Sequence, residues 1–151
     1  LSESSVRRLG DQVPMIDTLL ESTLQGRDKP RLIVVNFFAT WCGPCLTELP
    51  HLQQLADKYA DRNDILFVVV GREETQETLD AFVAKNSYRI PFVADPAGTH
   101  YSNFANKIIP RTYLLDRDRK IRFEIAGFDR TALEQLQKTI DALAADSNMQ
   151  P

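Results

Sequence analysis

The feature that most restricts the fold of this chain is a nearly continuous apolar run at residues 32–38 (LIVVNFF), with a cysteine four positions after it. Branched and aromatic side chains that do not alternate with polar ones are typical of a strand buried on both faces of a sheet. A second run of this kind, residues 65–70 (ILFVVV), predicts another central strand. Because both faces of such strands need helices to cover them, the sequence predicts an α/β fold.

Helix and strand patterns alternate along the rest of the chain. The first strand is followed in order by a helix, strand, helix, strand, helix, strand, strand and helix, with short strands at residues 92–93, 112–115 and 121–125. The last two strands are joined by a charged turn (DRDR), so they should pair antiparallel. The prediction is a central mixed β-sheet flanked by helices. Thr131 and Glu134 have the spacing of a capping box and should open the last helix.

Length and charge narrow the class of protein further. A chain of 151 residues suits one domain, which we place at residues 13–145, between a flexible lead-in (1–12) and a flexible tail (146–151). The net charge of −3 gives no reason to expect a nucleic-acid partner. No apolar run reaches the ~18 residues of a membrane span. The chain begins with Leu1, which is compatible with a removed N-terminal anchor or leader.

The two cysteines of the chain, Cys42 and Cys45, are only two residues apart. A loop this short restricts the unfolded chain little, so the pair is better suited to chemistry than to stapling. Cys42 lies where the next helix begins, and the partial positive charge of a helix N-terminus favours its thiolate. Cys45 lies one turn further on the same helix face. We therefore expect Cys42 to attack a partner's disulfide and Cys45 to resolve the mixed disulfide.

The residues around the pair fit this chemistry. Gly43 and Pro44 suit a tight first helical turn, and Trp41 offers an apolar contact to a partner. The redox group is then the Cys42–Cys45 disulfide itself, with no further cofactor. A zinc site is not expected, because neither histidine of the chain has zinc-finger spacing to the cysteines.

Two other functions remain open from the residues alone. A thiol peroxidase of the peroxiredoxin type favours Thr three residues before its reactive cysteine, where this chain has Ala39. A redox-silent protein-binding module would carry the dithiol without using it. Peroxide turnover and a double cysteine-to-serine variant separate these two alternatives from disulfide exchange.

Residues 34–45 (VVNFFATWCGPC), followed by Glu48, Leu49 and Pro50, resemble the thioredoxin superfamily and, more closely, the TlpA/ResA-type bacterial thiol–disulfide oxidoreductases. The resemblance extends over residues 13–143 and implies a thioredoxin fold. It also implies that residues 72–96 form the extra helix–strand insertion of this group. Ile109 and Pro110 match the cis-proline segment that faces the disulfide and holds the partner's backbone.

The resemblance further implies roles for individual polar residues. Asn36 stands where thioredoxin has a buried aspartate that exchanges a proton with the second cysteine. ResA-like members place a glutamate near the cysteines, and Glu74, with Glu73 beside it, is the best match for a base toward Cys45. Many relatives have Thr after the cis-proline, whereas this chain has Arg111, which would favour an acidic partner surface.

The resemblance also implies a cellular role. Members of this group exchange disulfides with protein partners and receive electrons from an upstream thiol protein. They usually work in the periplasm or otherwise outside the cytoplasm, as reductants that include cytochrome c biogenesis among their roles. We expect the same of this chain, as a monomer.

Overall fold

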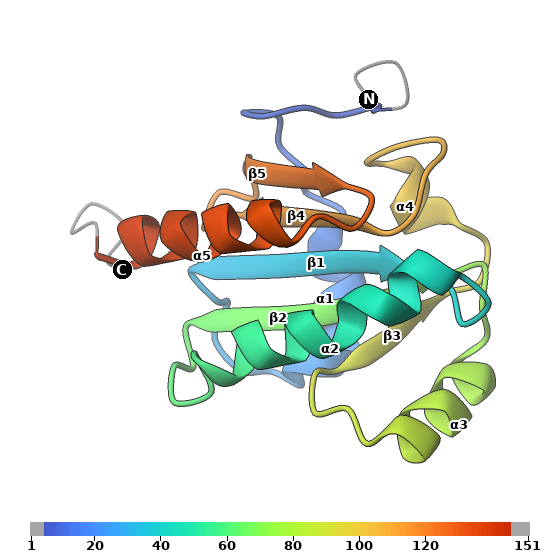
Figure 1. Ribbon diagram of the computed structural model, residues 1–151. Coiled ribbons are helices and arrows are strands. Elements are labelled where there is room, and N and C mark those ends of the chain that lie inside the picture. The colour runs from blue at the N-terminus through green and yellow to red at the C-terminus, as the bar shows by residue number, and fades with distance from the viewer. Residues whose placement is uncertain (1–4, 146–151) are drawn as a thin grey trace.

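The computed structural model describes residues 5–145 and shows one mixed sheet between two layers of helices (Figure 1). The strand order is β3-β2-β1-β4-β5. The strands are β1 (Leu32–Phe38), β2 (Ile65–Arg72), β3 (Phe92–Asp95), β4 (Arg111–Leu115) and β5 (Ile121–Ala126). The helices are α1 (Ile16–Leu24), α2 (Gly43–Asp57), α3 (Gln76–Asn86), α4 (Thr99–Ser102) and α5 (Arg130–Ala145).

The pairing of the strands confirms the predicted mixed sheet. β1 pairs with β2 in parallel and with β4 antiparallel, β2 pairs with β3 in parallel, and β4 pairs with β5 antiparallel. The unit formed by α3 and β3 is the extra helix–strand insertion expected within residues 72–96. Its helix starts at the Thr75 side chain, which accepts a hydrogen bond from the backbone of Thr78.

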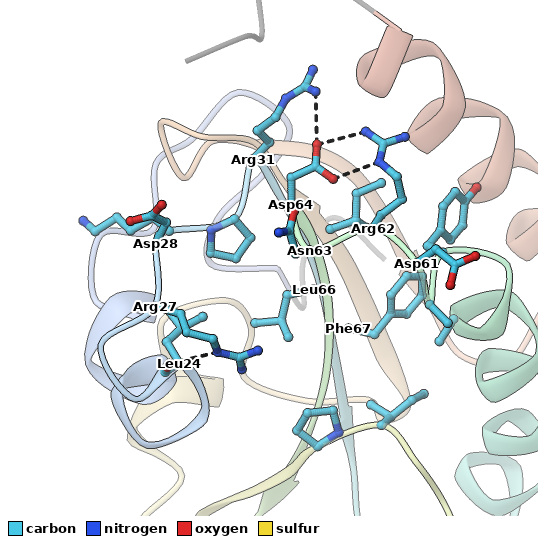
Figure 2. A pocket seen from close by; sticks show the side chains of 18 of the residues that line it. Leu24, Arg27, Asp28, Arg31, Asp61, Arg62, Asn63, Asp64, Leu66 and Phe67 are labelled. Atoms are coloured by element: carbon cyan, nitrogen blue, oxygen red, sulfur yellow. Dashed lines mark hydrogen bonds and ion pairs between the residues drawn. The ribbon is translucent and has the colours of Figure 1, made fainter.

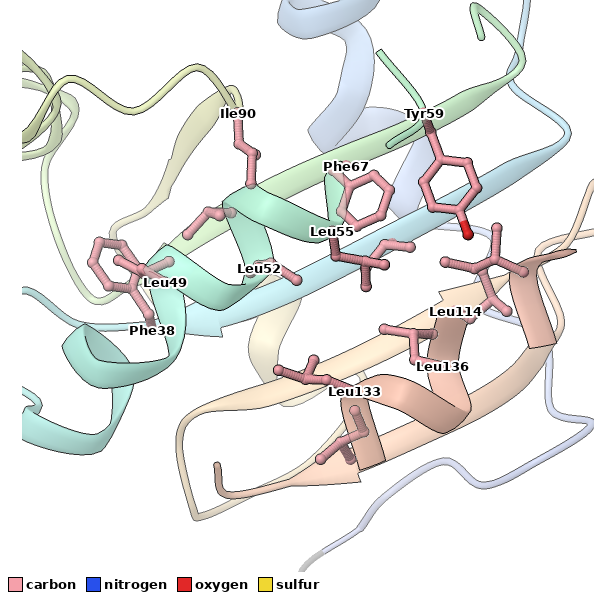
Figure 3. Packing of buried hydrophobic residues seen from close by; sticks show 14 of the residues in the cluster. Phe38, Leu49, Leu52, Leu55, Tyr59, Phe67, Ile90, Leu114, Leu133 and Leu136 are labelled. Atoms are coloured by element: carbon pink, nitrogen blue, oxygen red, sulfur yellow. The ribbon is translucent and has the colours of Figure 1, made fainter. Parts of the chain in front are cut away.

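Strand β1 explains why its sequence is apolar at almost every position. All seven of its residues are buried, because its side chains point alternately to two different hydrophobic cores. Phe37 faces the core formed with α1 and α4, whereas Phe38 faces the core formed with α2, α3 and α5. Figure 3 shows the second core, where Leu49, Leu52 and Leu55 of α2 lie over the sheet and Leu136 comes from α5.

The segment before α1 is in contact with the domain over the part that the structure describes. Ser5 forms a bridge with Ala105 and Gln12 one with Lys120, and the backbone N–H of Val6 donates to Phe104 at 2.9 Å. Residues 5–12 thus lie against the domain, where the sequence predicted a flexible lead-in. Residues 1–4 and the predicted tail at residues 146–151 lie outside the described residues.

The start of α5 differs from the prediction. The helix begins at Arg130, and Asp129 accepts a hydrogen bond at 3.1 Å from the backbone N–H of Ala132. Asp129 is therefore the cap, two positions before the capping box expected at Thr131 and Glu134. Asp129 and Thr131 are both residues that can cap a helix, and the structure uses the first. Over residues 5–145, no helix combines the length and the apolar character needed to cross a membrane.

Candidate active site

The two cysteines lie at the carboxyl end of β1, where α2 begins (Figure 1). Cys42 has extended backbone angles and occupies the N-cap position of α2, and Pro44 lies in the first turn. The two cysteines form a disulfide, with their Cα atoms 5.2 Å apart. The Sγ atom of Cys42 accepts a hydrogen bond at 3.3 Å from the backbone N–H of Cys45. A thiolate at Cys42 is therefore stabilised both by this N–H and by the helix dipole.

The surroundings of the disulfide are asymmetric. Cys45 is 1% exposed, Cys42 is 6% exposed, and Trp41 next to them is 76% exposed. Cys42 is therefore the more accessible of the two cysteines. This order agrees with the expectation that Cys42 attacks and the more buried Cys45 resolves.

The Ile109–Pro110 segment lies beside the disulfide, as the resemblance implied. Its peptide bond is cis, and the carbonyl oxygen of Ile109 is 4.0 Å from the Sγ atom of Cys42. Pro110 is buried, and its carbonyl accepts a hydrogen bond at 2.7 Å from the backbone N–H of Gly127. The tertiary structure thus brings together two segments that are more than sixty residues apart.

A carboxyl group that the sequence did not single out lies within the core one turn after Cys45. Glu48 is 0% exposed, and its Oε1 atom accepts a hydrogen bond at 2.8 Å from Nδ2 of Asn36. The same Nδ2 donates to Oγ1 of Thr112 at 2.9 Å. Burial raises the pKa of Glu48 from 4.5 to about 7, while hydrogen bonds with Asn36 and Thr112 act in the opposite direction. A carboxyl group with such a pKa exchanges its proton near neutral pH.

Glu48 also has an oxygen free for proton transfer. Among the described residues, its Oε2 atom is buried and has no hydrogen-bond partner. Residues at i and i+3 lie on the same side of a helix, which places Glu48 next to Cys45 along α2. The sequence signal was this spacing together with Asn36, an amide on β1 whose side chain points to the same face. Its charge alone would place Glu48 on the exposed face of the helix, whereas the fold buries it.

Glu74 has different contacts from those expected of a base toward Cys45. It is buried, and its two carboxylate oxygens accept hydrogen bonds from the backbone N–H and the hydroxyl of Thr40, the latter at 2.8 Å. These contacts fix the loop between β1 and Cys42. Glu73, the alternative, is exposed and lies 3.7 Å from Nε of Arg72.

Arg111 does not face a partner. It is 1% exposed, and its Nε atom donates hydrogen bonds to the carbonyl oxygens of Lys107 at 3.1 Å and Ile108 at 3.2 Å. The expectation that it favours an acidic partner surface was therefore wrong. β4 begins at Arg111, and alternation along the strand directs this side chain into the α1 and α4 face instead of into solvent.

A separate cavity of about 1160 Å3 lies at the opposite end of the sheet, where β1 and β2 begin (Figure 2). Within it, Asp64 forms ion pairs with Arg31 at 3.1 Å and with Arg62 at 2.9 Å. Neither cysteine lines this cavity. The thiol chemistry is thus confined to the carboxyl end of β1.

Comparison with known proteins agrees with this site. The model of the Redoxin family matches residues 10–140. The thiol-disulfide oxidoreductase ResA of Bacillus cereus (strain ATCC 10987 / NRS 248) is 26% identical over 140 residues, which are 91% of this chain and 79% of ResA. The thioredoxin-like protein YneN of Bacillus subtilis (strain 168) is 31% identical over 117 residues, covering 76% of this chain and 68% of YneN. Other ResA proteins are matched over as little as 57% of their length.

A solved structure from Bacteroides thetaiotaomicron confirms the fold. It superposes with a TM-score of 0.77 and covers 91% of each chain at 22% sequence identity, which is evidence for the fold alone. The family match and the curated relatives carry the argument further, because the cysteine pair lies within the matched residues. The chain belongs to the Redoxin family of the thioredoxin superfamily and is a ResA-like thiol–disulfide oxidoreductase whose redox pair is Cys42 and Cys45.

Proposed function

We propose that this protein reduces disulfide bonds of protein partners, with Cys42 as nucleophile and Cys45 as resolving thiol. The thiolate of Cys42 attacks one partner sulfur, the partner's disulfide breaks, and its second sulfur leaves as a thiolate that takes up a proton. Cys45 then loses its proton and attacks Cys42, which releases the first partner sulfur. The partner gains two electrons and two protons, and the enzyme ends with the Cys42–Cys45 disulfide. An upstream dithiol protein returns it to the reduced form.

Glu48 is the proton acceptor for Cys45 in this proposal. Its support is the buried carboxyl group one turn from Cys45, with one oxygen held by Asn36 and the other without a partner among the described residues. A base acts best when its pKa lies near the working pH, and the pKa of about 7 for Glu48 meets that condition. Glu74, by contrast, positions the loop before Cys42 through Thr40.

Exposed apolar side chains around the disulfide support a protein as the partner. Trp41 is 76% exposed, Ile108 is 40% exposed and Leu46 is 37% exposed. They flank Cys42 on both sides: Trp41 and Leu46 belong to its own segment, and Ile108 precedes the cis-proline segment. Apolar side chains grouped at a reactive site are typical of a surface that is covered during binding. Gly43, Pro44, Ile109 and Pro110 complete this proposed binding surface.

The observation that carries the proposal is the position of Cys42, at the N-terminus of α2 and 4.0 Å from the carbonyl of Ile109. The test is a single-turnover reaction of pre-reduced protein with insulin, followed by precipitation of the insulin B chain. The wild type should reduce insulin, Cys42→Ser should be inactive, and Cys45→Ser should accumulate a mixed disulfide on Cys42. A Cys42→Ser variant that reduces insulin at the wild-type rate would overturn the assignment. Peroxide turnover without insulin reduction would favour the peroxidase alternative.

A matched pair of variants decides which carboxyl group serves Cys45. In Glu48→Gln the resolving step should slow by about 100-fold or more near pH 7, the range associated with loss of a general base. In Glu74→Gln it should stay within about threefold, because Gln retains an oxygen that accepts a hydrogen bond from Thr40. Stopped-flow release of the second thiol measures this step directly. If Glu74→Gln slowed the resolving step more than Glu48→Gln did, Glu74 would be the base.

We further propose that the protein works as a reductant outside the cytoplasmic membrane, with an apoprotein that carries a Cys-x-x-Cys-His haem-attachment site as a candidate substrate. The support is the similarity to ResA-type proteins over most of the chain. In intact cells that express the protein from its own gene, a membrane-impermeant maleimide should label Cys42. Labelling only after lysis would contradict the location, and failure to reduce an oxidised Cys-x-x-Cys-His peptide would contradict the substrate.

A further inference from the structure

The residue before the cis-proline segment has an unusual backbone. Ile108 has a φ of 77°, in the left-handed region that branched side chains rarely occupy. Such a conformation is unfavourable for Ile and persists only where surrounding contacts impose it. Ile108 is also 40% exposed, so packing of its own side chain is not what holds it.

Two buried side chains donate hydrogen bonds to the carbonyl group of Ile108. The hydroxyl of Tyr101 donates a hydrogen bond to this oxygen at 2.7 Å, and Nε of Arg111 donates another at 3.2 Å. Both side chains are 1% exposed. Nε of Arg111 also reaches the carbonyl of Lys107 at 3.1 Å, so the same guanidinium holds two successive peptide groups.

The two donors are themselves well fixed. The ring of Tyr101 packs edge-on against Phe37 at 5.4 Å between ring centres, and the guanidinium of Arg72 lies 4.2 Å from its centre. Arg111 donates from Nη1 to the hydroxyl of Tyr113 at 3.3 Å. The donors therefore belong to a rigid core that extends to β1, the strand that leads to the redox pair.

This fixation acts on the peptide group that faces the disulfide. Ile109 follows Ile108 directly, and its carbonyl oxygen is the atom 4.0 Å from Sγ of Cys42. A rotation about the backbone of Ile108 would turn the Ile109 peptide away from that position. We infer that Tyr101 and Arg111 are positioning residues for disulfide exchange: by holding Ile108 in its left-handed conformation they keep the Ile109 backbone aligned to bind the partner's chain beside Cys42.

The inference rests on the proposed reduction of protein disulfides, and Tyr101→Phe tests it with the least disturbance. This change removes only the hydroxyl and keeps the buried ring. Tyr59→Phe is the matched control, because it removes the hydroxyl of another buried tyrosine, which bonds to Asp141 at 2.7 Å in the opposite core and has no contact with Ile108, Tyr101 or Arg111 among the described residues. Each variant is assayed with insulin and with a small aromatic disulfide, which has no peptide backbone to align against Ile109.

With insulin, Tyr101→Phe should lower kcat/KM roughly fivefold through a higher KM. A change of this size corresponds to the loss of about one hydrogen bond that positions the bound partner. With the small disulfide the rate of Tyr101→Phe should match the wild type, and Tyr59→Phe should match the wild type with both substrates. An equal loss with both substrates, or no loss with insulin, would overturn the inference. A wild type that reacts with the small disulfide and not with insulin would instead overturn the proposed function.

The backbone angle of Ile108 and a double variant test the same inference independently of the insulin assay. A crystal structure of Tyr101→Phe should show Ile108 displaced from its left-handed angle, and an unchanged angle would contradict the inference. In an Ile108→Asn background the left-handed conformation is less unfavourable, since Asn tolerates it better than Ile. The effect of Tyr101→Phe on this angle and on KM should therefore shrink in the double variant, and full additivity would contradict the proposed mechanism.

Discussion

Replacement of Glu48 by Gln should make the oxidised protein more stable at alkaline pH and change it little in mild acid. Gln has the shape of the protonated carboxyl group and retains an oxygen to accept the hydrogen bond from Asn36. It lacks the negative charge that burial disfavours. The oxidised form is chosen because its cysteines are joined in the disulfide and do not titrate.

The magnitude follows from the pKa of Glu48, which burial raises from 4.5 to about 7. The folded protein therefore binds this proton more tightly than the unfolded chain, and the stability that the group contributes is greatest below pH 4.5. It is lost as the pH rises through 7, where the buried carboxyl group must ionise. The whole rise in pKa corresponds to a loss of about 3 kcal/mol in the free energy of unfolding of the wild type. Between about 2 and 3 kcal/mol of this loss occurs between pH 5 and pH 8.

Urea unfolding of the two proteins at pH 5 and pH 8 measures this difference. At pH 8 the midpoint of Glu48→Gln should exceed that of the wild type by roughly 1–2 M urea, given a typical slope for a domain of this size. At pH 5 most of that excess should disappear. If the difference between the two proteins were the same at both pH values, Glu48 would have an ordinary pKa and its role as a proton acceptor near neutral pH would lose its basis.

Other positions carry predictions for stability. Leu52 on α2 is 1% exposed within the core of Figure 3, so Leu52→Ala should destabilise the protein by about 3 kcal/mol in urea unfolding, and a loss below about 1 kcal/mol would contradict the packing. Asp129→Ala should cost about 1 kcal/mol because it removes the cap of α5, while Thr131→Ala should stay within about 0.5 kcal/mol. A larger effect at Thr131 would restore the capping box that the sequence pattern predicted.

The redox pair and the layer order were predictable because they depend on local patterns. Strand β1 is recognisable by apolar residues at every position except Asn36, and Cys42 comes where a strand pattern gives way to a helical one. The helix that follows has to bury its apolar face against that strand, which sets the α/β arrangement. The insertion of α3 and β3 likewise shows local signals, including the Thr75 cap.

The residues around the cysteines were harder to assign, because a side chain's role depends on which face of its element the fold buries. The i, i+3 spacing puts Glu48 beside Cys45 along α2, but the sequence does not show that Glu48 is buried or that Glu74 turns toward Thr40. Packing of α2 on β1 places Glu48 against Asn36, while the end of β2 places Glu74 against Thr40. Arg111 was expected at the surface because a cationic side chain is usually exposed unless it is paired, and only the fold shows that it is buried.

The chain's own order of residues determines its chemistry: two thiols one turn apart at a helix N-terminus, where the local dipole favours a thiolate. Only the tertiary structure decides what surrounds them, since Ile109 comes from the loop before β4, Tyr101 from α4 and Arg111 from β4, and Glu48 meets Asn36 of β1. Local backbone preference acts over a few residues, whereas burial and hydrogen bonding between distant segments depend on the whole folded sheet. That is why the cysteine pair was evident from the sequence, whereas the buried Glu48 and the donors to Ile108 were not.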